Sequence, residues 1–161
     1  MKPATHPGAR HVQNVLGDGF TVVEFDASTK TSAEAAAAIG CSVAQIAKSI
    51  VFKTVAGARP VLVVASGSNR VDEKKVSAAL GEKVKSADAA YVKATTGFEI
   101  GGVAPVGHAA EPVVLLDQDL QQFKTIWAAG GAGNAVFELT WGDLVRLTGG
   151  KAADVAKAQT P

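Results

Sequence analysis

Lys48 is the residue whose neighbours point most directly to chemistry. It follows a segment in which Ser42 and Gln45 have the spacing of a helix cap, and it precedes the apolar run Ile50-Val51-Phe52. A lysine between a capped helix and a buried strand either extends its ammonium to solvent or points into a cleft and holds an anion. The residues alone leave both interpretations open.

A glycine-rich segment is the second candidate for chemistry. Gly101, Gly102 and Gly107 surround Pro105 in the stretch GGVAPVG. Glycines tolerate positive φ and leave backbone N–H groups accessible to a ligand carbonyl, whereas proline stiffens the loop. The same residues also suit a tight turn that binds nothing.

Ordinary catalytic and metal motifs are absent from the sequence. It contains no G-x-S-x-G, H-E-x-x-H or G-x-x-x-x-G-K-[ST] motif and no paired cysteines. Cys41 is the single cysteine, and His6, His11 and His108 are too few and too scattered for a ligand set. We therefore expect no disulfide, no metal and no cofactor, and an enzyme of this sequence would lack a side-chain nucleophile.

The distribution of charge is more informative than its total. The 161 residues carry 16 Lys and Arg against 15 Asp and Glu, a near-balance that argues against a protein that coats duplex DNA. Residues 48–93, however, hold nine basic and four acidic side chains. This excess of positive charge either binds a short stretch of phosphates or forms an ordinary solvated surface.

The elements that must position these residues alternate irregularly between helix and strand. Thr31 with Glu34, and Ser42 with Gln45, predict two successive capped helices, the first ending at Gly40 and the second running to about Lys48. Helices are also expected at Ala9–Leu16, Asp72–Leu80, Asp88–Ala94, near Leu120, and from Thr140 to Leu147. Strands are expected at Phe20–Phe25, Ser49–Val55, Pro60–Ala65, Val113–Leu116, Thr125–Ala129 and Ala135–Leu139.

This pattern predicts an α/β protein of the α+β type, a single domain over residues 1–161 with a mixed, curled sheet flanked by helices. Residues 1–8 are expected to form a loose lead-in, and the tail after Gly149 is expected to fray. No run of 18 apolar residues and no signal peptide is present, so we expect a cytoplasmic protein without membrane contact.

An ordered set of short motifs resembles the YbaK/ProRS-associated domain family, which includes bacterial trans-editing aminoacyl-tRNA deacylases. The resemblance covers about residues 20–155, and its most specific part is a lysine followed much later by G-x-x-x-P. It is carried by Thr31 with Ala35-Ala36, Gln45-Ile46-Ala47-Lys48-Ser49, Ala65-Ser66-Gly67, Thr96-Gly97-Phe98 through Pro105-Val106-Gly107, Leu116-Asp117, and Asp143-Leu144-Arg146-Leu147-Thr148-Gly149.

The resemblance implies hydrolysis of the ester that joins a wrong amino acid to the 3′-terminal ribose of proline tRNA. It implies that Lys48 holds the tRNA 3′ end near its phosphate and that the loop from Gly101 to Pro105 presents backbone donors to the scissile carbonyl. Water would attack with help from the substrate's ribose hydroxyl, so no side-chain nucleophile is needed. The catalytic residues implied are Lys48, Gly101, Gly102 and Pro105.

Two further groups of residues complete the expected site. Substrate-binding residues are expected to be Phe25, Thr31, Ile46, Ser66, Gly67, Phe98, Val103, Ala104, His108 and Asp117, and tRNA-binding residues Lys48, Lys53, Arg70, Lys74 and Lys75. The stretch Gly131-Ala132-Gly133 departs from the Thr-Pro-containing turn of similar proteins, which affects pocket shape.

Three functions remain open at this point. The chain removes alanine or a similarly small residue from proline tRNA, or it is a cysteinyl-tRNA(Pro) deacylase, or it binds a tRNA acceptor end without catalysis. Mischarged tRNA is the expected partner of either deacylase, and an uncharged tRNA acceptor end is the expected partner of the binding module. Prolyl-tRNA synthetase is the second expected partner.

Overall fold

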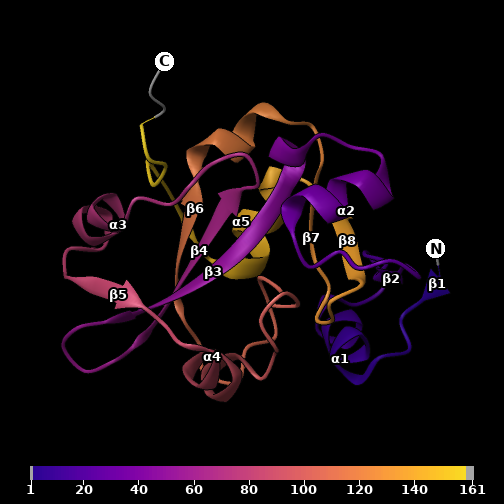
Figure 1. Ribbon diagram of the computed structural model, residues 1–161, viewed down its shortest axis with the longest axis horizontal. Coiled ribbons are helices and arrows are strands. Elements are labelled where there is room, and N and C mark those ends of the chain that lie inside the picture. The colour runs from indigo at the N-terminus through magenta and orange to yellow at the C-terminus, as the bar shows by residue number, and fades with distance from the viewer. Residues whose placement is uncertain (1, 159–161) are drawn as a thin grey trace.

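A single mixed β-sheet organises the computed structural model, which describes residues 2–158 (Figure 1). The hydrogen-bonded order of the strands is β1-β2-β8-β7-β3-β4-β6-β9, and β5 pairs with β3 outside this path. Their bounds are β1 Lys2–Pro3, β2 Val23–Glu24, β3 Ile46–Thr54, β4 Pro60–Ser66, β5 Val84–Ser86, β6 Val113–Asp117, β7 Ile126–Ala129, β8 Ala135–Leu139 and β9 Lys151–Ala153.

Helices connect these strands and cover the sheet. They are α1 Pro7–Leu16, α2 Ser32–Ile39, α3 Glu73–Leu80, α4 Ala89–Thr96 and α5 Trp141–Thr148, with short 3-10 helices η1 Val43–Gln45 and η2 Gln118–Gln122. Side-chain caps begin most of them: Thr31 and Thr140 form capping boxes, and Asp72 and Asp88 accept backbone N–H groups. No helix within residues 2–158 is long and apolar enough to cross a membrane.

Strand β3 is the centre of the sheet and carries Lys48. Along one edge it pairs with antiparallel β4 from Ala47 to Lys53. Along the other edge it pairs with β7 only at residues 46–47 and with β5 only at residues 52–54. Residues 48–51 therefore have no partner strand on that edge, and a gap opens between β7 and β5.

The two faces of the sheet are packed differently. Val51, Leu62 and Leu116 belong to the largest apolar cluster, which α1, α4 and α5 complete. Phe52 and Val63 point to the opposite face, where they pack with Val76 of α3 and with Val155. Because side chains alternate along a strand, Lys48 shares the Phe52 face. Figure 1 shows α3 and α1 at opposite ends of the molecule.

The predicted mixed sheet flanked by helices is confirmed, and so are most of the predicted elements. The hairpin formed by β3 and β4 and the helices capped by Thr31, Asp72, Asp88 and Thr140 lie where the residues indicate, with ends that shift by a few residues.

The prediction of a helix running to Lys48 is wrong. The capped segment is one 3-10 turn that ends at Gln45, and residues 46–48 already belong to β3. Pairing with β4 across seven successive residue pairs extends the strand back over these residues. The capping box between Ser42 and Gln45 is present, but it begins a turn and not a full helix.

The predicted strand Phe20–Phe25 is also too long, since only Val23–Glu24 pairs with β8. The side chain of Gln13 explains why residues 20–22 are not part of the strand. Its Nε2 donates to Phe20 O at 2.8 Å, and its Oε1 accepts from Val22 N–H at 2.8 Å. These bonds satisfy the backbone in place of a neighbouring strand.

Both chain ends are more ordered than predicted within the described range. Lys2–Pro3 pairs with β2, and α1 begins at Pro7, inside the expected lead-in. Lys151–Ala153 pairs with parallel β6, and Val155 is fully buried, so residues 150–158 do not fray. Residues 159–161 of the predicted frayed tail lie outside the description.

Candidate active site

A cleft of about 430 Å³ lies at the gap in the sheet beside β3. Its volume is within the range of roughly 300–1,000 Å³ that small-molecule sites occupy. The walls come from β3, β7, the start of α2, and the glycine segment: Thr29, Lys30, Thr31, Ser32, Ala35, Ile46, Ala47, Lys48, Ser49, Ile50, Gly67, Gly101, Val103, Trp127, Ala128, Ala129 and Val136.

Lys48 lines this cleft and is half-buried. Its ammonium donates a hydrogen bond to the backbone carbonyl of Asn69. Burial lowers the pKa of Lys48 from its ordinary value; the Asp117 carboxylate acts in the opposite direction, and the Arg70 guanidinium lowers the pKa further. The cation is therefore oriented by the protein but has no ion-pair partner among residues 2–158.

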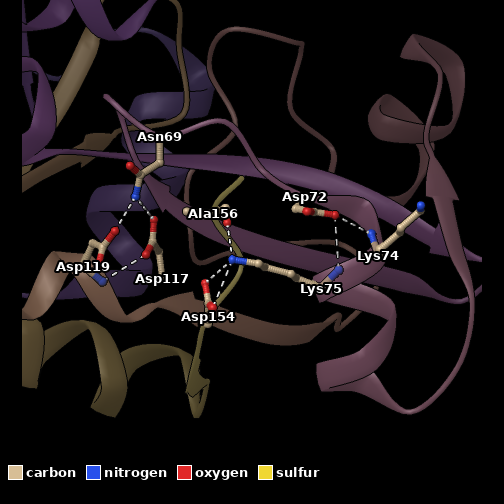
Figure 2. A network of polar contacts seen from close by, with 8 residues as sticks. All are labelled: Asn69, Asp72, Lys74, Lys75, Asp117, Asp119, Asp154 and Ala156. Atoms are coloured by element: carbon tan, nitrogen blue, oxygen red, sulfur yellow. Dashed lines mark hydrogen bonds and ion pairs between the residues drawn. The ribbon is translucent and has the colours of Figure 1, made fainter. Parts of the chain in front are cut away.

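The loop that positions Lys48 is held by a buried carboxylate (Figure 2). Asp117, which is 1% exposed, accepts the backbone N–H of Ser66 at 3.0 Å and the side-chain amide of Asn69 at 2.9 Å. Asp119 accepts the same amide at 2.8 Å. Asp117 and Ser66 were predicted to bind substrate; neither lines the cleft, and both hold the loop behind it.

The glycine segment forms the facing wall. Gly101 and Val103 line the cleft and donate no backbone hydrogen bond to the residues described, whereas Gly102 N–H donates to Glu99 O at 3.0 Å. Two donors are therefore available for a ligand. Gly102 is required by close approach, since a Cβ there would lie 2.9 Å from the backbone of Ala132.

Other predicted site residues are distributed between the cleft and its surroundings. Ile46 and Gly67 line the cleft, as does Thr31, although the Thr31 hydroxyl caps α2 by accepting Glu34 N–H at 3.1 Å. Several predicted residues do not line it: Phe25, Phe98, Ala104, Pro105 and His108.

Ala104, Pro105 and His108 share one cause, because the glycine segment turns away from the cleft after Val103. Pro105 and His108 line a separate pocket, and Phe98 is buried beneath the segment against the His108 ring. His108 bonds to Ala104 O at 2.6 Å, and burial lowers the pKa of its imidazole.

The predicted tRNA-binding cations also separate. Arg70 is exposed beside Lys48, and Lys74 is exposed on α3. Lys75 forms an ion pair with Asp154 at 3.0 Å, so its positive charge is already paired within the protein (Figure 2). Lys53 lies 5.0 Å from the Tyr91 ring centroid. It is five residues along β3 from Lys48, which is about 16 Å, and it points to the other face.

Ser49 and Lys30 are two of the cleft residues that sequence reasoning did not identify as site residues. Ser49 lines the wall, and its buried Oγ has no hydrogen-bond partner within residues 2–158. Its position beside Lys48 was the available signal. Lys30 also lines the cleft, and its stem lies 3.0 Å from where a Cβ on Gly101 would be. No sequence motif marks Lys30, because its contact with Gly101 spans distant segments.

The residues that line the cleft offer backbone donors, serine hydroxyls and cations, and they include no nucleophile paired with a base. Within residues 2–158 no group of three His, Cys, Asp or Glu side chains could hold a metal ion. The chemistry available is the binding of an anionic or carbonyl-containing ligand and the stabilisation of an oxyanion by backbone N–H groups.

Comparison with known proteins identifies the class to which this fold and cleft belong. The model of the aminoacyl-tRNA editing domain matches residues 26–147, and the chain belongs to that family. Members of this class are aminoacyl-tRNA deacylases, which are hydrolases.

Individual relatives agree with the family. The chain is 39% identical to the "Uncharacterized protein YwhH" of Bacillus subtilis, covering 84% of this chain and 87% of the relative. It is 32% identical to the "Putative Cys-tRNA(Pro)/Cys-tRNA(Cys) deacylase EbsC" of Enterococcus faecalis, covering 68% and 70%. A crystal structure of "a putative trans-editing enzyme for prolyl tRNA synthetase" superimposes with a TM-score of 0.90 at 42% identity, covering 96% of this chain and all of that one.

Proposed function

We propose that the protein is a trans-editing deacylase that hydrolyses the ester of mischarged proline tRNA, with alanine or a similarly small residue as the amino acid. The observation that carries the proposal is the placement of Lys48 and the free N–H groups of Gly101 and Val103 around one cleft. A cation for the tRNA phosphate and donors for the acyl carbonyl are the two requirements of such a substrate.

The proposed reaction uses the substrate's own ribose hydroxyl to assist water. The water oxygen bonds to the acyl carbon and the ester C–O bond breaks. One water proton passes through the ribose hydroxyl to the ribose oxygen that leaves, and the other is released to solvent as the carboxylate forms. The N–H groups of Gly101 and Val103 stabilise the oxyanion of the tetrahedral intermediate, at roughly 10²–10³ in rate per donor. Lys48 binds the terminal phosphate and fixes the ester between them.

The walls of the cleft support a small amino acid. Ile46, Val103, Ala128 and Ala129 surround the space with short apolar side chains. Apolar pockets discriminate by only about 1–3 kcal/mol per methylene, which is why editing is needed and why the pocket must exclude proline by shape. We propose that Ile46 and Val103 set this limit.

Removal of cysteine is the second candidate, because one relative carries a cysteinyl-tRNA deacylase name. Cysteine differs from alanine by one sulfur atom, and Ser32 and Ser49, which line the cleft, carry hydroxyl groups that suit a thiol. A binding module without catalysis is disfavoured, since it would have no use for two unbonded N–H groups in the cleft that Lys48 lines.

A panel of charged tRNAs tests the proposal. Proline tRNA carrying labelled alanine, cysteine or proline is mixed with excess protein, and the amino acid released is measured over time. We expect fast release of alanine and none of proline. Faster release of cysteine would support the second candidate. Release of none would contradict both, and binding without release would support the binding module.

The cellular setting follows from this activity. We propose that the chain acts as one domain in the cytoplasm, where tRNA is charged, and that it meets its substrate after release from prolyl-tRNA synthetase. Co-purification with the synthetase, with and without charged tRNA, tests whether a complex forms.

A further inference from the structure

A second groove adjoins the cleft and shares Lys48 with it. Its volume is about 460 Å³, and it lies on the sheet face that α3 covers. It is lined by Lys48, Ile50, Phe52, Arg70, Val71, Glu73, Ser86 and Lys157. Because Lys48 lines both spaces, a ligand that contacts its ammonium can extend from one into the other.

The floor of this groove is apolar. Ile50 and Phe52 follow Lys48 at alternate positions of β3 and point to the same face, and Val71 extends the floor. A floor of this kind, with the ring of Phe52 in it, suits the base of a nucleotide, whose flat face stacks on aromatic and apolar side chains.

The rim is basic, and the backbone places its charges. Lys157 N–H donates to Arg70 O at 2.7 Å, and Asp72 N–H donates to Val155 O at 2.7 Å. Between these bonds, Val71 forms an antiparallel bridge with Ala156. The segment that carries Lys157 is therefore joined directly to the segment that carries Arg70.

Lys75 of α3 also binds the segment that carries Lys157 (Figure 2). Its ammonium bonds to both carboxylate oxygens of Asp154 at 3.0 Å and to Ala156 O at 2.7 Å. On the other side, Asn69 is held by Asp117 and Asp119. The positions of Arg70 and Lys157 are thus set by fixed neighbours.

The charges of Arg70 and Lys157 are not used within the protein. Neither forms an ion pair in the described part of the chain, and both are exposed. Glu73 is the one carboxylate among the residues that line the groove, against three cations. An excess of positive charge above an apolar floor matches a polynucleotide backbone, whose phosphates contact cations while its bases pack below.

We propose that this groove binds the nucleotides that precede the terminal adenosine of the charged tRNA, with Arg70 and Lys157 holding their phosphates. The inference rests on the proposed function, and it gives the single-stranded 3′ end a path across Lys48 into the cleft. Single-stranded ends expose both phosphate and base to a protein, as this groove requires.

Two substrates distinguish the contribution of this groove to activity from that of the cleft. The double variant Arg70→Ala/Lys157→Ala is compared with the wild type on alanyl-tRNA(Pro) and on 3′-O-alanyl-adenosine, which lacks the preceding nucleotides. We expect the KM for the tRNA to rise about tenfold and the slope of its salt dependence to fall by about 1.4, from two lost phosphate contacts. Hydrolysis of alanyl-adenosine, which has no phosphate for either cation to bind, should fall far less than hydrolysis of the tRNA.

Binding of uncharged tRNA gives a readout independent of catalysis. The double variant should bind labelled tRNA(Pro) about tenfold more weakly, whereas Arg10→Ala/Lys151→Ala should bind like the wild type. Arg10 and Lys151 are exposed cations that line neither space, which makes them a matched control. Equal affinity of the wild type and the Arg70/Lys157 variant for tRNA(Pro) would overturn the inference about the groove. Failure of the wild-type protein to hydrolyse any of the charged substrates would overturn only the proposed function.

Discussion

The ammonium of Lys48 donates to the backbone carbonyl of Asn69, a residue 21 positions away on the loop after β4. This bond orients the lysine along the boundary between the cleft and the second groove, which Arg70 and Lys157 also line. Asn69 is itself held by Asp117. The position of the lysine therefore depends on a buried carboxylate that does not reach the substrate.

Asp117→Asn should weaken the site through this connection. The substituted amide places a donor against Ser66 N–H, Asn69 Nδ2 or Asp119 N–H, so the free energy of unfolding should fall by about 1–3 kcal/mol. Because the Asp117 charge raises the pKa of Lys48, its loss should also move the alkaline limit of activity to lower pH. Urea unfolding and a pH–rate profile measure the two effects. An unchanged profile with lowered stability would make Asp117 purely structural.

The pH dependence of the wild type follows from the lowered pKa of Lys48. Lysine must be charged to bind phosphate, so activity should fall as the pH rises through a pKa that lies below the ordinary 10.5. The unfolded chain holds this proton to higher pH than the folded one, so the shift makes stability rise with pH between the two values.

Arg70→Ala provides the test of that assignment. It removes a neighbouring positive charge that lowers the pKa of Lys48, so the alkaline limb should move to higher pH. The rate is measured from pH 7 upward after subtraction of uncatalysed ester hydrolysis. A limb that stays in place, or moves down, would show that another group controls it.

Gly102→Ala should damage the cleft without unfolding the protein. Its Cβ would lie 2.9 Å from the backbone of Ala132, so the glycine segment must shift and Val103 N–H must lose its position. We expect kcat to fall by about 10²-fold, the effect of losing one oxyanion donor. Gly142→Ala is the matched control, because its nearest neighbour would be 3.8 Å away. Equal activity of both variants would remove the segment from the mechanism.

Ser49→Ala should raise the stability of the protein and lower its activity. Its buried Oγ has no partner within residues 2–158, so the substitution removes an unpaired polar group, and the free energy of unfolding should rise by up to about 1 kcal/mol. If the hydroxyl contacts the substrate, deacylation should slow at the same time. Thermal unfolding and single-turnover rates check this, and a variant that is both less stable and fully active would contradict it.

Local signals predicted the elements well. Thr31, Asp72 and Thr140 begin helices because their side chains accept backbone N–H groups nearby, which depends only on neighbouring residues. The strand prediction for residues 49–55 is confirmed, but residues 46–48 were predicted as the end of a helix and belong to the same strand, because seven residue pairs with β4 outweigh one capping box.

The site was predicted only in part, because its remaining members come together through long-range packing. Of the predicted site residues, Lys48, Gly101 and Ile46 line the cleft. Pro105 and His108 line a separate pocket, because the segment turns away after Val103. Lys157 joins Arg70 through a backbone hydrogen bond across 87 positions, and no local pattern indicates such a pairing.

The most direct test of the central claim is single-turnover hydrolysis of alanyl-tRNA(Pro) by Lys48→Met, beside Lys53→Met. Both variants remove one lysine charge from β3, but Lys53 lines neither the cleft nor the groove. We predict that Lys48→Met loses at least about 10²-fold in rate, the scale of one lost positioning contact, while Lys53→Met keeps the wild-type rate. Equal rates for Lys48→Met and the wild type would contradict the assignment of this cleft as the active site.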